Sequence, residues 1–217
     1  MSQWLQFFFG RKEGASFHED RLREMVQAVE GIAIPQLLPD LTGQLVLEIA
    51  PALAPMAPLL KSKGARLVAD WGTSEGFSVK SRPGWIPFLD ASLDCVLGRI
   101  SFEKKEVPRL IPEMARVLKQ GGCLILADLH PFSPPVQEEY LKNPVTPDGL
   151  APGFERYYRF FKNGPLVLES VREYFFDGSL KKLFLEGEKG QYERVRKRPF
   201  MMMWTLRKDK EGGANEH

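Results

Sequence analysis

The sequence predicts a doubly wound α/β fold, in which helices cover both faces of a mostly parallel sheet. Short apolar runs recur along the chain, each with the uniform hydrophobicity of a strand that is buried on both faces. Segments with apolar residues at helical spacing alternate with these runs, and glycines stand where helices should stop. At 217 residues, 43% of them hydrophobic, the chain is long enough to bury one such core.

The amino-terminal part of the chain contains the first predicted helix. Ser16, Phe17, His18 and Glu19 have the pattern of a capping box, and apolar residues follow at helical spacing until Gly31. The helix should therefore begin at the capping box and end at this glycine. We expect residues 1–43 to form helices that cap the sheet.

Residues 45–49 are the first predicted strand, which leads into a turn and a helix over residues 53–62. Residues 66–69 are predicted as the second strand. Only six residues separate Asp70 from Phe77, whereas a parallel crossover needs a dozen or more. The helix that would connect the second and third strands is therefore expected to be missing or truncated, which leaves either a hairpin-like edge or no third strand.

Two further buried strands are predicted at residues 93–98 and 123–129, joined by a helix that should end at Gly121 and Gly122. An aromatic helix at residues 154–161 and strand-like segments at 167–176 and 200–206 follow. We expect one domain over residues 1–207, with capping helices at 1–43, the core sheet at 44–130, a substrate lid at 131–165, carboxyl-terminal strands at 166–207 and a flexible tail at 208–217.

Charge and composition narrow the possible function classes. Lys and Arg total 30 against 28 for Asp and Glu, so we expect no nucleic-acid partner. No apolar run approaches the roughly 20 residues of a membrane helix, and the opening residues lack the features of a signal peptide. Cys95 and Cys123 lie in apolar strands without metal-ligand spacing, which predicts buried reduced thiols, no metal site and a cytoplasmic location.

Two stretches carry a resemblance to a known family. WIPFLDASLD, from Trp85 to Asp94, enters one predicted strand, and ARVLKQGG, from Ala115 to Gly122, enters the next. With the acid that ends the first strand, they resemble the class I S-adenosylmethionine-dependent methyltransferases over residues 41–131. The resemblance implies a Rossmann-like sheet with one antiparallel carboxyl-terminal strand, to which residues 198–206 are similar.

The same resemblance implies where S-adenosylmethionine would bind. Laid on the family's V-L-D-x-G-x-G-x-G signature, Glu48 takes the acid, and Ala50, Ala52 and Ala54 take the three glycines. Each alanine adds a methyl group where backbone amides must approach the cofactor. Two prolines in the turn also fix φ and remove amide donors. The turn is therefore predicted to be stiffer and narrower than in the family.

The remaining cofactor positions have both functional and structural interpretations. Asp70 resembles the acid that receives the ribose hydroxyls, but it could equally form a turn with Gly72. Glu48 either contacts the methionine amino group or caps the following helix, and the second role is favoured. The acid that faces the adenine in the family would lie near Ser81 or Arg82, and neither is acidic.

His130 is the candidate catalytic residue. It follows a predicted strand in a D-L-H-P stretch that some family members share, and an imidazole suits a general base. Methyl transfer needs a base only when the nucleophile is protonated, so a structural histidine bonded to its loop is equally consistent. We expect His130 to border the cleft rather than the core, so that replacement by Ala costs under roughly 1 kcal/mol.

Two other features have similar pairs of interpretations. The aromatic residues of the helix at 154–161 either wall a hydrophobic substrate pocket or, more typically at helical spacing, pack in the core. The basic run from Arg194 to Arg198 either receives an acidic partner such as a carrier protein or is a solvated surface.

The sequence favours a methyltransferase-like protein with an eroded cofactor site, which binds S-adenosylmethionine weakly or not at all and serves as a binding or partner subunit. The alternative is an active methyltransferase that acts on a small molecule or a carrier-bound acyl substrate. S-adenosylmethionine is the expected cofactor if there is one, and the sequence does not determine the oligomeric state.

Overall fold

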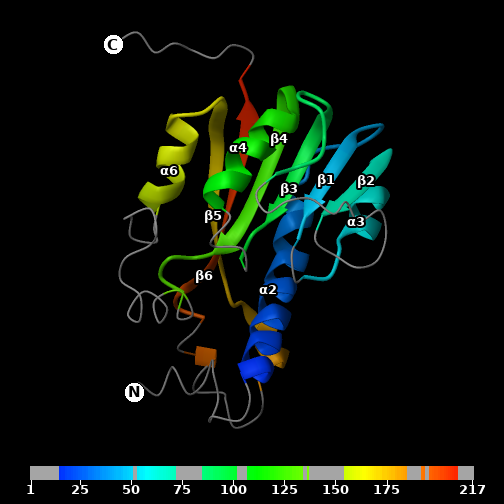
Figure 1. Ribbon diagram of the computed structural model, residues 1–217. Helices are drawn as coiled ribbons and strands as arrows, with labels where there is room; N and C mark the ends of the chain where they lie inside the picture. The colour runs from blue at the N-terminus through cyan, green and yellow to red at the C-terminus, as the bar shows by residue number, and fades with distance from the viewer. Residues whose placement is uncertain are drawn as a thin grey trace. The chain divides into compact units, whose positions relative to one another are not determined.

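The computed structural model describes residues 15–50, 53–71, 85–101, 107–133, 136, 154–184, 192–193 and 196–209. In these residues a six-stranded sheet has the order β2-β1-β3-β4-β6-β5 (Figure 1). The strands are β1 Leu45–Ile49, β2 Leu67–Trp71, β3 Leu93–Arg99, β4 Leu118–Leu129, β5 Leu166–Phe175 and β6 Pro199–Lys208. The helices are α2 Ala15–Leu37, α3 Ala57–Ser62, α4 Val107–Val117, α6 Phe154–Lys162 and the 3-10 helix η1 Gly178–Leu183.

Strands β2, β1, β3 and β4 are neighbours and run parallel, as the sequence predicts. Strand β6 is antiparallel to β4, since the His130 N–H donates to the Phe200 carbonyl at one end and the Lys208 ammonium donates to the Leu118 carbonyl at the other. The predicted antiparallel carboxyl-terminal strand is therefore confirmed, and the sheet is Rossmann-like, with four parallel strands in the order β2-β1-β3-β4.

The chain divides into two compact units. Unit 1 comprises Met1–Ile34, Leu129–Arg156 and Arg172–Met202, and unit 2 comprises Pro35–Asp128, Tyr157–Val171 and Met203–His217. The predicted single domain over residues 1–207 stays a prediction.

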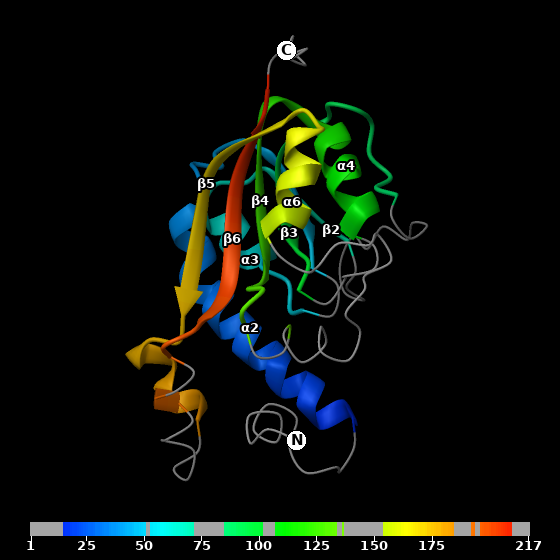
Figure 2. The same ribbon diagram turned by 90° about the vertical axis from the view of Figure 1, so that its left-hand side faces the viewer.

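In unit 2, helices α3 and α4 lie on opposite faces of the sheet (Figure 2). The chain moves outward from β1 to β2 and then in the other direction from β3 to β4, so right-handed crossovers place the two helices on opposite faces. Helix α4 packs closely, because a Cβ added at Gly98 would come within 2.9 Å of the side chains of Leu126 and Met114. The buried core of unit 2 therefore includes the contact between α4 and strands β3 and β4.

Unit 1 has its own apolar core. Helix α2 buries Met25, Val26, Val29 and Ala33 at helical spacing. A separate aromatic cluster comprises Phe176, Phe184, Tyr192 and Phe200, in which the ring centroids of Phe176 and Phe200 lie 4.5 Å apart.

Several predicted boundaries are wrong. Helix α2 already includes Ser16 and continues past Gly31 to Leu37, because the buried stripe goes on through Ala33 and Ile34 and packing outweighs the low helix propensity of glycine. Helix α3 begins at Ala57 instead of residue 53, with Pro58 in the first turn, where proline is well tolerated.

The end of helix α4 also differs from the prediction. It ends at Val117, and β4 begins at Leu118 and runs through Gly121 and Gly122, so the two glycines lie in the strand. Gly121 has a φ of 76°, which is a backbone conformation that glycine adopts without strain.

Some predictions fall outside the described residues. One is the prediction that the helix between the second and third strands is missing or truncated. The others concern the adenine-facing position near Ser81 or Arg82, Ala52, Arg194, most of the lid and the tail beyond Asp209. They stay predictions.

Candidate functional site

The carboxyl ends of β1, β2 and β3 meet at the point where the strand order reverses. Ligands on open α/β sheets bind at such a switch point. Glu48 on β1 is the register partner of Asp70 on β2 and of Leu97 on β3, so the structure brings the two predicted acids to neighbouring strand ends. Asp70 lies within β2 rather than in a turn.

Glu48 is fully buried and bound to the start of α3. Its Oε1 and Oε2 accept from the Met56 N–H at 2.9 and 2.8 Å, and Met56 is the N-cap position of that helix. This contact is the capping role that the sequence favours. A carboxylate at this end also interacts favourably with the helix dipole.

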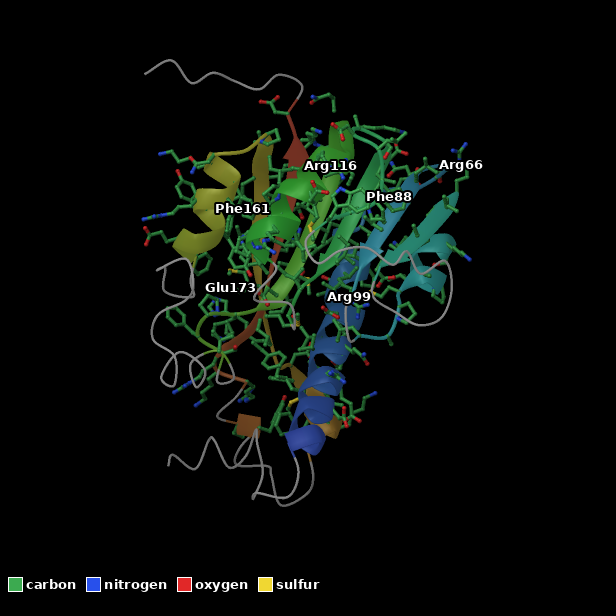
Figure 3. The ribbon with its side chains drawn as sticks, in the orientation of Figure 1. Arg66, Phe88, Arg99, Arg116, Phe161 and Glu173 are labelled. Atoms are coloured by element: carbon green, nitrogen blue, oxygen red, sulfur yellow. The ribbon has the colours of Figure 1, made fainter. Side chains whose placement is uncertain are left out.

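Arg99, at the end of β3, is the ion-pair partner of Glu48. Its Nη1 donates to Glu48 Oε1 at 2.7 Å and to the Ala54 carbonyl at 2.6 Å. Figure 3 labels Arg99 among the side chains of the sheet. The exposed fractions of the two side chains are 1% for Arg99 and 0% for Glu48. One buried guanidinium therefore joins the end of β1 to the turn that follows it.

In the described part of the turn, several backbone polar groups are hydrogen-bonded within the protein. The Leu53 N–H donates to the Ala50 carbonyl at 3.2 Å, the Met56 N–H is bonded to Glu48 and the Ala54 carbonyl is bonded to Arg99. Ala50 is buried and Ala54 is exposed, and neither has a positive φ. The described part of the turn thus has conformations that alanine adopts without strain.

Sequence reasoning missed Arg99, although a signal was present. Arg99 ends β3 after an apolar run from Cys95 to Gly98, and a charge buried in such a place requires a partner. Glu48 and Asp70 both lie near the ends of predicted strands, so the sequence offered two acids. The pairing of β1 with β3 in the structure identifies Glu48 as the partner.

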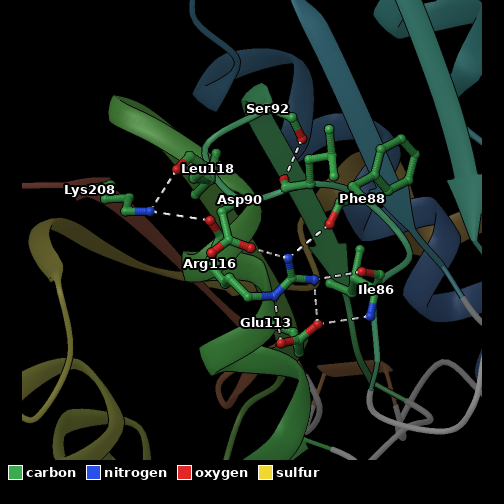
Figure 4. Close-up of polar contacts among 9 residues, drawn as sticks. Ile86, Phe88, Asp90, Ser92, Glu113, Arg116, Leu118 and Lys208 are labelled. Carbon is green, nitrogen blue, oxygen red and sulfur yellow. Dashed lines mark hydrogen bonds and ion pairs between the residues drawn. The ribbon is translucent and has the colours of Figure 1, made fainter.

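The two family-like stretches are joined by a hydrogen-bond network around Arg116 (Figure 4). The Arg116 guanidinium donates to the carbonyls of Ile86 and Phe88 at 2.7 and 2.8 Å and to the carboxylates of Asp90 and Glu113 at 2.6 to 2.8 Å. Glu113 also accepts from the Ile86 N–H at 3.0 Å. The pKa of Arg116 is raised by Glu113, and that of Glu113 is lowered by Arg116. The network holds the loop before β3 against α4.

His130, in unit 1, follows β4 and has both ring nitrogens engaged. Nδ1 accepts from the Phe132 N–H at 3.0 Å, so Nε2 carries the proton of the neutral ring and donates to Glu173 Oε1 at 3.0 Å. The Ser133 N–H donates to the His130 carbonyl at 2.8 Å. This is the loop-bonded arrangement of a structural histidine.

The expected surface position of His130 is wrong. Its side chain is fully buried, because the ring packs beside Phe132 and Phe154 and against Glu173. Burial lowers the pKa of His130 below its usual value, and the hydrogen bond to Glu173 opposes that shift only in part. A catalytic role for His130 stays a prediction.

The aromatic helix α6 divides between core and surface. Tyr157 and Phe161 are buried and pack on Trp204, with ring centroids 4.3 and 6.3 Å from it, and the Tyr157 hydroxyl is hydrogen-bonded to Asp128. Phe154 and Tyr158 are exposed. The core interpretation is therefore confirmed for the two buried rings.

Two further sequence features are located by the structure. In the basic run, Arg196, Lys197 and Arg198 are exposed, and Arg196 pairs with Glu193 at 2.6 Å, as in a solvated surface. Cys95 and Cys123 are buried register partners on β3 and β4.

Three solved structures illustrate what this chain resembles. An S-adenosylmethionine-dependent methyltransferase from Mesorhizobium loti is 13% identical, with a TM-score of 0.61 over 82% of this chain and 97% of that one. Geranyl diphosphate C-methyltransferase from Streptomyces coelicolor A3(2), in complex with Mg²⁺, geranyl diphosphate and S-adenosyl-L-homocysteine, is 16% identical, with a TM-score of 0.60 over 93% and 87%.

The third structure is a complex between the Haloferax volcanii methyltransferase activator Trm112 and a protein assigned as a methyltransferase, which is 14% identical with a TM-score of 0.64 over 92% and 96%. No protein-family model matches the chain, and no curated protein matches it in sequence. Within the described residues, no helix is both long and apolar enough to cross a membrane.

Proposed function

We propose that this chain, which has the fold of the class I S-adenosylmethionine-dependent methyltransferases, has an eroded cofactor site and binds S-adenosylmethionine weakly or not at all. The observation that carries the proposal is the buried ion pair between Glu48 and Arg99. It lies where the family resemblance would place the methionine part of the cofactor.

The residues present do not fit that part of the cofactor. A ligand that used the turn's backbone would compete with Glu48 for the Met56 N–H and with Arg99 for the Ala54 carbonyl. Hydrogen bonds to charged groups are worth roughly 1.5–3 kcal/mol each, so displacing the bonds that Glu48 and Arg99 make to the turn costs about that much per bond. Any favourable contact with the cofactor would first have to offset that cost.

The alanines act in the same direction. Ala50 is buried at the end of β1, so its methyl group already occupies space beside the turn. In the family, glycine at this position permits the close approach of the backbone to the ligand. The substitutions and the ion pair are separate obstacles, since restoring a glycine would leave Arg99 and Glu48 in place.

Without cofactor chemistry, the chain would serve as a binding or partner subunit. The similar structure solved together with a methyltransferase activator supports a protein partner for a chain of this fold. The alternative function is an active methyltransferase acting on a small molecule or a carrier-bound acyl substrate, and the similar enzyme with bound S-adenosyl-L-homocysteine supports S-adenosylmethionine as its cofactor.

Calorimetry and thermal unfolding with S-adenosylmethionine and S-adenosyl-L-homocysteine test the proposal. We expect no micromolar binding and no rise in unfolding temperature at millimolar ligand, because a ligand at 100 times its Kd would add about 2.7 kcal/mol of stability. The Streptomyces coelicolor enzyme is the positive control. A micromolar Kd for this chain would contradict the proposal and favour the active methyltransferase.

A further inference from the structure

Four side chains of unit 1 form a group that we name the His130 cluster: His130, Phe132, Phe154 and Glu173. The ring centroid of His130 lies 5.4 Å from that of Phe132 and 5.8 Å from that of Phe154, and His130 Nε2 lies 3.0 Å from Glu173 Oε1. The buried imidazole thus joins two aromatic rings to one carboxylate.

The members around His130 remain open to solvent. The exposed fractions are 58% for Phe132, 43% for Phe154 and 44% for the Glu173 side chain, whereas His130 is fully buried. Two large rings at this exposure leave apolar area that a ligand could cover. The cluster therefore combines a buried, hydrogen-bonded imidazole with three side chains that solvent can reach.

The charge of the cluster is negative. Because His130 Nδ1 accepts from the Phe132 N–H, the ring is neutral and its Nε2–H donates to Glu173, so the imidazole adds no positive charge that would offset the glutamate. Within the described part of the chain, Glu173 has no lysine or arginine partner, and Arg172 precedes it on β5, where successive side chains point to opposite faces.

The half-exposed Glu173 carboxylate and the two exposed aromatic rings all lie against the His130 imidazole, and together they match one ligand chemistry. Ammonium groups are attracted both to carboxylates and to the faces of aromatic rings, and their apolar substituents bury area on those rings. An anion would be repelled by Glu173, and a neutral apolar ligand would gain nothing from it. The complementary ligand is an organic cation.

We propose that the His130 cluster is a binding site for organic ammonium ions with apolar substituents, with Glu173 supplying the charge and Phe132 and Phe154 the aromatic faces. His130 is a positioning residue, since it fixes Glu173 and the Phe132 backbone and does not itself meet the cation. The proposal is independent of S-adenosylmethionine binding, because every group involved lies in unit 1 and the Glu48–Arg99 pair lies in unit 2.

The test uses benzyltrimethylammonium as the probe and benzyl alcohol, which has the same ring without the charge, as its neutral counterpart. Both are titrated into the full chain without S-adenosylmethionine and followed by the chemical shifts of backbone amides. We expect saturable binding of the cation that is at least about tenfold tighter than binding of the alcohol and that weakens as salt is added.

Variants then assign the binding to the cluster. Glu173→Gln keeps an oxygen that can accept from His130 Nε2 and removes the charge, so the variant should fold and bind the cation at least about tenfold more weakly. Phe132→Ala should also weaken binding. Glu169→Gln is the matched control, because Glu169 lies on the same strand but pairs with Arg207 in unit 2, and its binding should equal that of the unmodified chain.

Three results would overturn the proposal: no saturable binding of the cation, equal binding of the cation and the alcohol, or equal losses in Glu173→Gln and Glu169→Gln. Unfolding curves of each variant establish that it is folded before it is titrated. Since no assay contains S-adenosylmethionine, none of these results bears on whether the cofactor site is eroded.

Discussion

Arg99 and Glu48 lie 51 residues apart in the chain and form a buried ion pair, with Arg99 Nη1 at 2.7 Å from Glu48 Oε1. Burial removes both charges from water, and the pair is acceptable because the surrounding backbone supplies further hydrogen bonds at Met56 and Ala54. The pair holds the turn after β1 in one conformation, and this has consequences for stability and for ligand binding.

Replacing Arg99 by Met should destabilise the protein by roughly 3–5 kcal/mol, because the buried Glu48 carboxylate would lose the guanidinium with which it forms an ion pair. Adding Glu48→Gln to the same chain should recover part of the loss, since a neutral amide is cheaper to bury. Urea unfolding of the two single variants and the double variant measures the coupling. Additive losses would show that the two side chains do not depend on each other.

Restoring glycine at positions 50, 52 and 54 together should raise the affinity for S-adenosylmethionine only slightly, because the Glu48–Arg99 pair stays in place. Calorimetry should still detect no micromolar binding. Ala57→Gly in the first turn of α3 is the control for a general loosening of this segment. If the triple-glycine chain bound at micromolar Kd, the alanines alone would account for the loss.

Replacing His130 by Ala should cost about 2–3 kcal/mol, well above the surface value that the sequence predicts. The substitution leaves the part-buried Phe132 N–H without its acceptor, removes the bond to Glu173 and empties the fully buried site of the imidazole. Urea unfolding measures the difference. A loss of unfolding free energy under about 1 kcal/mol would instead be that of a surface residue.

The pH dependence of stability should carry a contribution from His130. Its pKa is lowered by burial in the folded chain, so the unfolded chain binds its proton more readily. The stabilisation is complete above the unfolded pKa of about 6.5 and is lost as pH falls through that value towards the lower folded pKa. Unfolding free energies from pH 8 to pH 5 should therefore fall more steeply in the unmodified chain than in His130→Gln. Parallel curves would show that His130 makes no such contribution.

Replacing Arg116 by Ala should release the loop that precedes β3. Arg116 holds the carbonyls of Ile86 and Phe88 and the carboxylate of Glu113, so we expect a loss of about 1–2 kcal/mol and faster amide exchange in residues 85–92. Arg196→Ala, which breaks an exposed pair with Glu193, is the control and should cost under about 1 kcal/mol. Equal rates of amide exchange in residues 85–92 of both variants would show that the Arg116 network does not hold this loop.

The sequence by itself indicated where β1, β2, β3 and β4 lie, because a run of apolar residues makes a buried strand in almost any context. Their parallel arrangement followed from the alternation of strands with helices, and the antiparallel β6 followed from the family resemblance. The capping role of Glu48 was the favoured one of two interpretations, since an acid near a strand end lies next to the helix that follows. The extension of α2 past Gly31 shows the limit of such information, since burial of Ala33 and Ile34 outweighed a local stop signal.

Only the tertiary structure decided the partners of the charged and polar side chains. Arg99 meets Glu48 because β3 lies beside β1, and His130 is buried against Glu173, 43 residues further along, because these segments come together in unit 1. The register of the strands fixes such pairs, and neither residue type nor local spacing encodes that register. From the sequence alone, Arg99 would be interpreted as an exposed charge and His130 as an unbonded imidazole. The chemistry open to each side chain depends on what surrounds it, and those neighbours are distant in the sequence.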